Sequence, residues 1–116
     1  MLTMNAEVIN ATIATGTSLS AEIALGAKQL VGIAMPAGWD AADLTFQVSV
    51  DGGTTFLEMQ TTAAAVDYKA AASQYIAVDP AIWRGINLIK VRSGTSGAAV
   101  NQTADRVLGL VIKPVS

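Results

Sequence analysis

The residue types that most often carry enzyme chemistry are scarce in this chain. Its 116 residues include no cysteine and no histidine. This excludes thiolate nucleophiles, cysteine-based metal sites and every histidine-assisted nucleophile. Asp40 and Asp43 stand three residues apart, but a calcium site or an acid–base pair needs more ligands or a second carboxylate at a defined distance. We therefore expect Asp40 to cap the start of a helical turn, and we expect no catalytic residue, metal or cofactor.

The clearest local motif is a tight turn between two predicted strands. Its residues are Ser49, Asp51, Gly53, Thr55 and Phe56, which resemble the Asp-box of sialidases with phenylalanine in the tryptophan position. In such a turn an aspartate side chain accepts hydrogen bonds from backbone amides, and an aromatic ring covers the turn. A propeller needs several blades, so one copy in this short chain indicates a structural hairpin and not a sialidase.

Two further patterns have a chemical and a structural interpretation. Gly94 and Gly97 could cradle a phosphate, but such cradles need a following helix and here a strand follows. Four aromatic residues could form a platform on which a sugar stacks, although such residues more often pack at the corners of the core. They are Trp39, Tyr68, Tyr75 and Trp83. Nine acidic residues always allow some carboxylate pair in space, so a glycosidase stays open as a less favoured alternative.

Composition points to interaction more than to chemistry. Charged residues make up 14% of the chain, whereas about a quarter is usual. Part of the surface is therefore expected to face a partner. The net charge of −2 argues against general binding of nucleic acid. No apolar stretch is long enough to span a membrane as a helix, and residues 1–6 lack the basic start of a secretory signal.

Short apolar or alternating runs separated by turn residues predict an all-β fold. We expect one domain over residues 1–116, an antiparallel β-sandwich of jelly-roll type with one short corner helix at 79–85. Leu44, Phe46, Val48 and Val50 should share one face of their strand. Residues 36–43 should be a loop with one helical turn, and residues 63–73 either a helix or a short strand plus loop. The expected strands are 7–15, 19–25, 28–35, 44–50, 56–61, 75–78, 86–92 and 106–115.

Two segments are candidates for ordering on a partner, namely the possible arm at residues 1–6 and the long loop at 93–105. The loop consists of small, mostly uncharged residues that bury little by themselves. Its candidate partner contacts are Ser93, Gly94, Thr95, Ser96, Gly97, Asn101 and Gln102. The last strand is apolar on both faces, so it is either central in its sheet or covered by another chain.

Residues 28–113 resemble a family of small virion structural proteins of tailed bacteriophages. The resemblance rests on the runs 30–36 and 44–55 with Trp39 between them, on 75–80, on 89–97 and on the stretch from Val100 to Arg106. It implies a β-sandwich without enzyme activity, made in the bacterial host cytoplasm and built into the virion. Within virions such sandwiches commonly serve as capsid cement, also called decoration, on the capsid surface. The implied partners are the major capsid protein and further copies of the chain.

Two alternatives to a cement protein remain open. A neck or tail accessory subunit would use the same physics with ring symmetry. A receptor- or glycan-binding module would need Trp39 or Trp83 exposed beside polar groups. An enzyme ranks third, because it would need a pocket that holds a strongly perturbed carboxylate.

Overall fold

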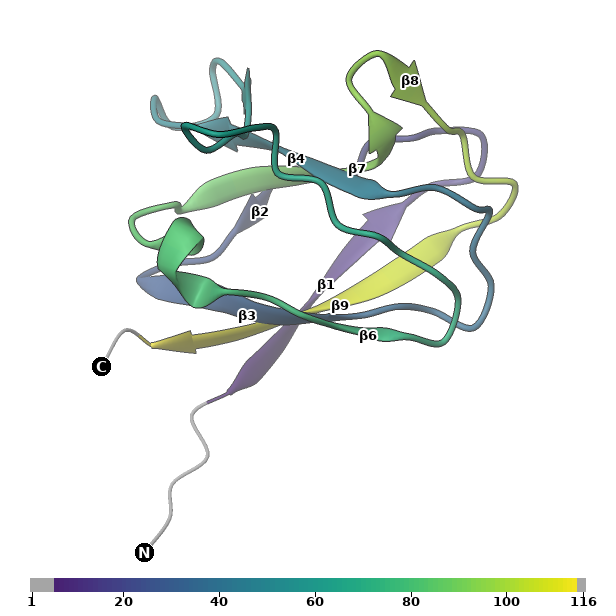
Figure 1. Cartoon of the computed structure of the whole chain (residues 1–116), viewed down its shortest axis with the longest axis horizontal. Coiled ribbons are helices and arrows are strands. Elements are labelled where there is room, and N and C mark those ends of the chain that lie inside the picture. Colours follow the sequence, from purple (N-terminus) through teal and green to yellow (C-terminus); the bar gives the residue numbers. More distant parts are fainter. Residues whose placement is uncertain (1–5, 115–116) are drawn as a thin grey trace, which may run out of the picture.

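The strands form two antiparallel sheets that pack face to face (Figure 1). The computed structural model describes residues 6–114, so most of the predicted arm at 1–6 lies outside the described residues. Sheet 1 has the order β1-β9-β3-β6, and sheet 2 has the order β2-β7-β4-β5, with β8 paired to the end of β7. Sheet 1 comprises β1 (Glu7–Ile13), β9 (Arg106–Pro114), β3 (Lys28–Ala34) and β6 (Tyr75–Ala77). Sheet 2 comprises β2 (Ile23–Ala24), β7 (Leu88–Thr95), β4 (Leu44–Ser49), β5 (Leu57–Glu58) and β8 (Ala98–Ala99).

The strand order is that of a jelly roll. When the two-residue β8 is left out, sheet 1 holds the first, last, third and sixth strands in that spatial order. Sheet 2 holds the second, seventh, fourth and fifth. Two four-stranded sheets connected in this way wind the chain through two Greek keys. The predicted fold class, an antiparallel β-sandwich of jelly-roll type, is confirmed.

The core lies between the two sheets and is closed at one end by aromatic side chains. Leu108, Leu110 and Ile112 of β9 are fully buried, as the two-residue period of a strand requires. Each such side chain contributes about 2 kcal/mol through burial. Trp83 packs edge-on against Phe46 with ring centroids 4.9 Å apart. It ends the 3-10 helix η1 (Pro80–Trp83), the corner helix predicted at 79–85, and Asp79 caps this helix by accepting a hydrogen bond from the Ala81 amide.

Several local predictions are wrong in detail. Residues 36–43 contain no helical turn, so Asp40 caps no helix. Val50 is 86% exposed, because the tight turn begins there and breaks the alternation of β4. Of the two alternatives for residues 63–73 the helix is absent, and the segment is a loop that bridges to neighbouring backbone at Ala65 and Tyr68. The strand predicted at 86–92 runs on to Thr95, into the segment predicted as a loop.

The last strand, β9, is central in sheet 1. It pairs with β1 on one side and with β3 on the other. Its inward side chains belong to the core, while Val107 on the opposite face remains 46% exposed. The apolar residues on both faces of this strand therefore reflect a central position together with an outer face that carries no charge between Val107 and Val111.

Candidate functional site

The predicted hairpin turn is present between β4 and β5. Asp51 Oδ1 accepts hydrogen bonds from the Thr55 amide at 2.9 Å and from Ser49 Oγ at 2.9 Å. Ser49 Oγ in turn accepts from the Gly53 amide at 2.8 Å. These hydrogen bonds, led by the one from the Thr55 backbone, lower the pKa of Asp51. The Lys90 ammonium lies over the ring of Phe56, 4.4 Å from its centroid.

The segment predicted as a long partner-ordered loop is mostly held by the protein itself. Ser93 and Gln102 are fully buried, and Gly94 is buried too. The chain turns back at Ser96 and Gly97 and pairs β8 with the end of β7. Gly94 has a φ of 93°, and a side chain there would collide with the Ala98 carbonyl at 2.5 Å. The tight return of this hairpin therefore depends on glycine at position 94.

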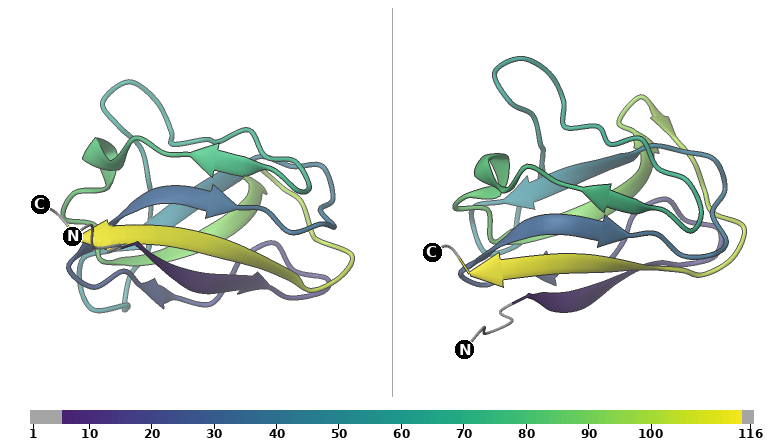
Figure 2. Two further views of the ribbon diagram at one scale, coloured as in Figure 1. Left: turned by 90° about the horizontal axis from the view of Figure 1, so that it is seen from below. Right: turned by 60° about the horizontal axis from the view of Figure 1, so that its bottom comes forward.

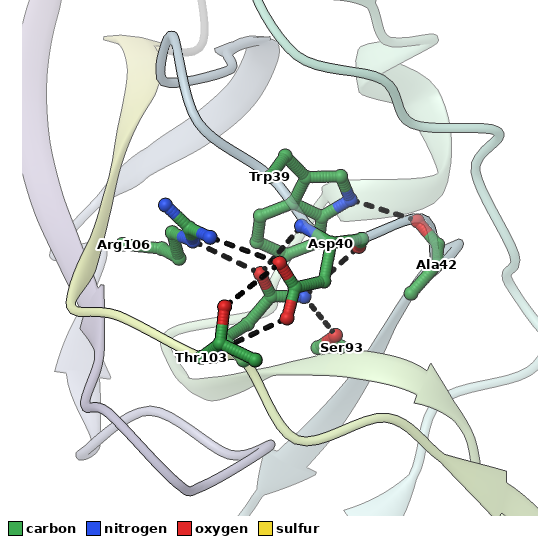
Figure 3. A network of polar contacts seen from close by, with 7 residues as sticks. Trp39, Asp40, Ala42, Ser93, Thr103 and Arg106 are labelled. Carbon is green, nitrogen blue, oxygen red and sulfur yellow. Dashed lines mark hydrogen bonds and ion pairs between the residues drawn. The ribbon is translucent and has the colours of Figure 1, made fainter.

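Polar side chains of several loops meet around Asp40, Thr103 and Arg106 (Figure 3). The fully buried amide of Gln102 lies at the centre of this group. Its Oε1 accepts from the Asp40 amide at 2.8 Å and from Arg106 Nε at 3.1 Å. Its Nε2 donates to the Asp40 carbonyl at 3.1 Å and to Ser93 Oγ at 2.8 Å. All four hydrogen-bonding positions of the amide are thus used. We call Gln102, Asp40, Ser93, Arg106 and Thr103 the polar cluster.

Asp40 joins two loops within the polar cluster. Its carboxylate accepts from the Thr103 amide at 2.9 Å, from Thr103 Oγ1 at 3.1 Å and from Arg106 Nη2 at 3.0 Å. Desolvation opposes ionisation, but the hydrogen bonds from Thr103 and Arg106 outweigh it and lower the pKa of Asp40. Gly38 leaves room for the guanidinium, since a Cβ there would lie 2.4 Å from Arg106 Nη1. The Asp40 carboxylate therefore holds the 36–43 segment against the 100–106 segment.

These contacts correct part of the predicted partner surface. Ser93, Gly94 and Gln102 lie inside the protein and cannot touch a partner in this conformation, because their hydrogen-bonding groups are turned toward neighbouring loops. Ser96, Gly97 and Asn101 are exposed, and Thr95 is half-buried. These four residues stay candidates for partner contact. The polar cluster escaped prediction because Asp40 and Gln102 are 62 residues apart in the sequence.

The two tryptophans do not form an exposed platform. Trp83 is fully buried, and its indole Nε1 donates to the Tyr68 hydroxyl at 2.9 Å. Trp39 is half-buried against the core, and its Nε1 donates to the Ala42 carbonyl at 3.0 Å. Tyr75 is 58% exposed, but it lies on a different face. The interpretation of the tryptophans as core corners fits this arrangement, and the stacking platform does not.

The outer face of sheet 2 carries a covered ion pair beside a pocket of about 340 Å³. Arg92 is 6% exposed and forms a bidentate pair with Glu58, while its Nε donates to Thr45 Oγ1 at 3.0 Å. The hydrogen bond from Arg92 lowers the pKa of Glu58. Across the pocket, partial burial and the neighbouring Asp43 carboxylate raise the pKa of Asp67. Arg92, the buried cation of this face, is thus paired within the chain.

The outer face of sheet 1 is different, because it is open and its middle carries no charged side chain; Lys113, opposite Gln29, lies at one end of this face. In the left view of Figure 2 its four strands lie in front, and no described segment crosses them. Val8 is 63% exposed and stands opposite Val111, and Asn10 stands opposite Gly109. The outward positions that we call the open face are Val8, Asn10, Thr12, Val107, Gly109, Val111, Gly32, Ala34, Tyr75 and Ala77. A partner could dock here without stripping water from any charge.

Within residues 6–114, no group of three or more acidic side chains is placed to hold a metal ion, and no helix is long and apolar enough to cross a membrane. The fold defines the class of protein as a jelly-roll β-sandwich, a class that serves many functions. No protein-family model, no curated protein and no solved structure matches the chain. The features that bear on function are therefore the open face and the resemblance of residues 28–113 to small virion proteins.

Proposed function

We propose that the protein is a non-enzymatic structural component of a tailed-bacteriophage virion, and specifically a capsid cement protein that binds the major capsid protein shell. The sequence resemblance supports the virion role. The jelly-roll sandwich is compatible with it, since this fold recurs in viral capsids. The low charge content supports adhesion as the work of the protein.

The observation that carries the proposal is the open face. Its ten positions include no charged side chain, while Val8, Tyr75 and Val107 expose apolar surface. Four strands about 4.8 Å apart, each contributing two or three outward residues, give a patch of roughly 300–400 Å². A stable interface commonly needs about 800 Å² per partner. The open face would therefore contribute about half of a capsid contact, and neighbouring loops such as Thr95 to Gly97 would supply the rest.

The experiment replaces one exposed apolar residue of the open face. Val107→Lys puts a charge where docking would bury it, and the side chain is exposed enough for the variant to fold. Capsids made without this protein are mixed with wild-type or variant protein, and the bound fraction is measured after sedimentation. We expect the wild type to bind and to raise the temperature at which the capsids release DNA. Val107→Lys should do neither.

The matched control is Val50→Lys, which adds the same charge at an exposed position on the hairpin of sheet 2. It should bind capsids as the wild type does. Binding by Val107→Lys at the wild-type level would refute the role of the open face. Imaging of intact particles tests the location: density at the neck or tail instead of the shell would favour the accessory subunit over cement.

The glycan-binding alternative has lost its main support. It needed an exposed tryptophan beside free polar groups, but Trp83 is buried and both indole N–H groups are engaged within the chain. The structure therefore does not favour glycan binding by these tryptophans.

A further inference from the structure

The four edge strands of the sandwich differ greatly in length. The edges of sheet 2 are β2 and β5, each two residues long, and one edge of sheet 1 is the three-residue β6. Short edges are one of the devices by which proteins avoid pairing with other chains. The other edge of sheet 1 is β1, which is seven residues long. In the left view of Figure 2 it is the outermost strand of the front sheet.

β1 also lacks the other protective devices. Its residues Glu7–Ile13 contain no proline, no lysine and no arginine, and its register with β9 runs without a bulge. Its one charged side chain, Glu7, is already paired with Lys28 of the same sheet. Within the described part of the chain, β9 is the strand that pairs with β1, so one side of the β1 backbone is open to a further strand.

We propose that β1 pairs antiparallel with β1 of a second copy of this chain, across a two-fold axis at Asn10. The two copies of sheet 1 would then form one continuous eight-stranded sheet. A two-fold interface must be self-complementary, because every contact of one residue with a second is repeated with the two copies exchanged. The inference stands independently of the virion role.

The β1 sequence is self-complementary in this register. Asn10 faces Asn10 of the second copy, and an amide can both donate and accept, so the two side chains can bond reciprocally. Val8 faces Thr12 of the second copy on the outer side, and Ile9 faces Ala11 on the inner side. Such β-branched cross-strand pairs are among those that stabilise sheets. The less favourable pair is that of Glu7 with Ile13, which lies at each end of the paired strands.

The charge of β1 does not oppose pairing with a second copy. The two Glu7 residues lie at opposite ends of the paired strands, about 20 Å apart and beyond the screening length of physiological salt. Each Glu7 instead falls in the row of Ile13 of the second copy and keeps Lys28 of its own chain as its ion-pair partner.

Single cysteines test the register directly, because the chain has no cysteine of its own. Directly opposed residues have Cα atoms about 4.5–5.5 Å apart, within the range that a disulfide bridges. Under mild oxidation N10C should form a covalent dimer with itself. A mixture of V8C and T12C should give the mixed dimer. T12C alone should not cross-link, because the two copies of position 12 lie about 14 Å apart along the paired strands. A77C on the opposite edge measures random collision.

Sedimentation velocity of the full chain from about 1 to 200 µM gives the noncovalent test. We expect a monomer–dimer equilibrium that N10K weakens at least tenfold, because two lysines would meet on the axis and because lysine protects edges. A77K, with the same charge on the same face at the β6 edge, should dimerise as the wild type does.

A wild type that stays monomeric throughout, or cross-linking of N10C no faster than that of A77C, would overturn the proposal. Dimers that persist in N10K but vanish in A77K would place the interface at β6 and would overturn it too. If the residues before Ala6, or a peptide of another protein, occupied the edge instead, N10C would not cross-link to itself. The tests use purified protein without capsids, so their failure leaves the proposed virion role untouched.

Discussion

Replacing Gln102 by alanine should lower the free energy of unfolding far more than the position of Gln102 in a polar segment suggests. The substitution removes four hydrogen bonds, of 2.8 to 3.1 Å, that join Asp40, Ser93 and Arg106. Each such bond contributes about 1 kcal/mol net, and a buried group left unpaired costs more. Asp40 and Arg106 lie close enough to the surface for water to replace part of the loss. We therefore expect Gln102→Ala to lower the free energy of unfolding by about 3 kcal/mol.

Urea denaturation followed by tryptophan fluorescence measures this loss. With a slope of about 1.5 kcal/mol per molar, the midpoint should fall by about 2 M. Gln102→Glu is the sharper variant, because it keeps the shape and the acceptor oxygen but, as a carboxylate, cannot donate to the Asp40 carbonyl. Its loss should be smaller than that of Gln102→Ala and should shrink in acid, where protonation restores a donor.

The control is Gln74→Ala, at an exposed position where the same truncation should cost less than about 0.5 kcal/mol. Hydrogen exchange adds a local readout, because amides of residues 98–105 should lose protection in Gln102→Ala and keep it in Gln74→Ala. If the two variants unfolded at the same urea concentration, the polar cluster would not be what holds the loop. The original expectation of a loop that orders only on a partner would then regain its support.

Three further outcomes follow from contacts elsewhere in the sandwich. Trp83→Ala should lower the free energy of unfolding by about 3–5 kcal/mol, because it removes a fully buried ring and leaves the Tyr68 hydroxyl without its donor. Thermal unfolding measures this loss, and a value below about 1 kcal/mol would contradict the prediction. A Cβ at Gly32 would lie 1.8 Å from the Tyr75 hydroxyl. The loss of stability in Gly32→Ala should therefore largely vanish when Tyr75 is also replaced by alanine. Additive losses in the double variant would show that positions 32 and 75 do not interact. Hydrogen bonds from Thr103 and Arg106 outweigh desolvation and hold the pKa of Asp40 below its ordinary value of 3.8. The contribution of this carboxylate to stability is complete above the unfolded pKa and is lost as the pH falls from there through the lowered folded pKa. The urea midpoint should therefore drop as the pH falls from about 5 to below the ordinary value, and Asp40→Asn should flatten that drop.

Much of the sandwich could be predicted from short-range patterns. Alternation along β9 and the turn chemistry after β4 each depend on neighbouring residues, and both patterns gave strands at the right places. The helix at Pro80–Trp83 was predictable for the same reason, because its cap and its proline adjoin it in the sequence. Val50 shows the limit of a simple period, since the residue that continues the alternation already belongs to the turn.

What could not be predicted depends on contacts between distant residues. Asp40 looks like a helix cap when only its neighbours are considered, and Gln102 looks like part of a solvated loop. Their roles emerge when the fold brings positions 40 and 102 within hydrogen-bond distance. The burial of Arg92 is hidden for the same reason, because its partner Glu58 is 34 residues away. A polar residue in a weakly patterned segment is therefore as good a candidate for a buried anchor as for a surface contact.

The pairing of the first described strand with the last sets the order in which the chain can fold during its synthesis. Glu7 of β1 lies opposite Ile112 of β9, and β3 also borders β9. Sheet 1 therefore cannot close until β9 has been made, although β1 is synthesised about 100 residues earlier. At roughly 5–20 residues per second, β1 waits about 5 to 20 s for its partner. During that interval both edges of β1 are free, so a newly made chain is most exposed to pairing with another copy before it has finished its own sheet.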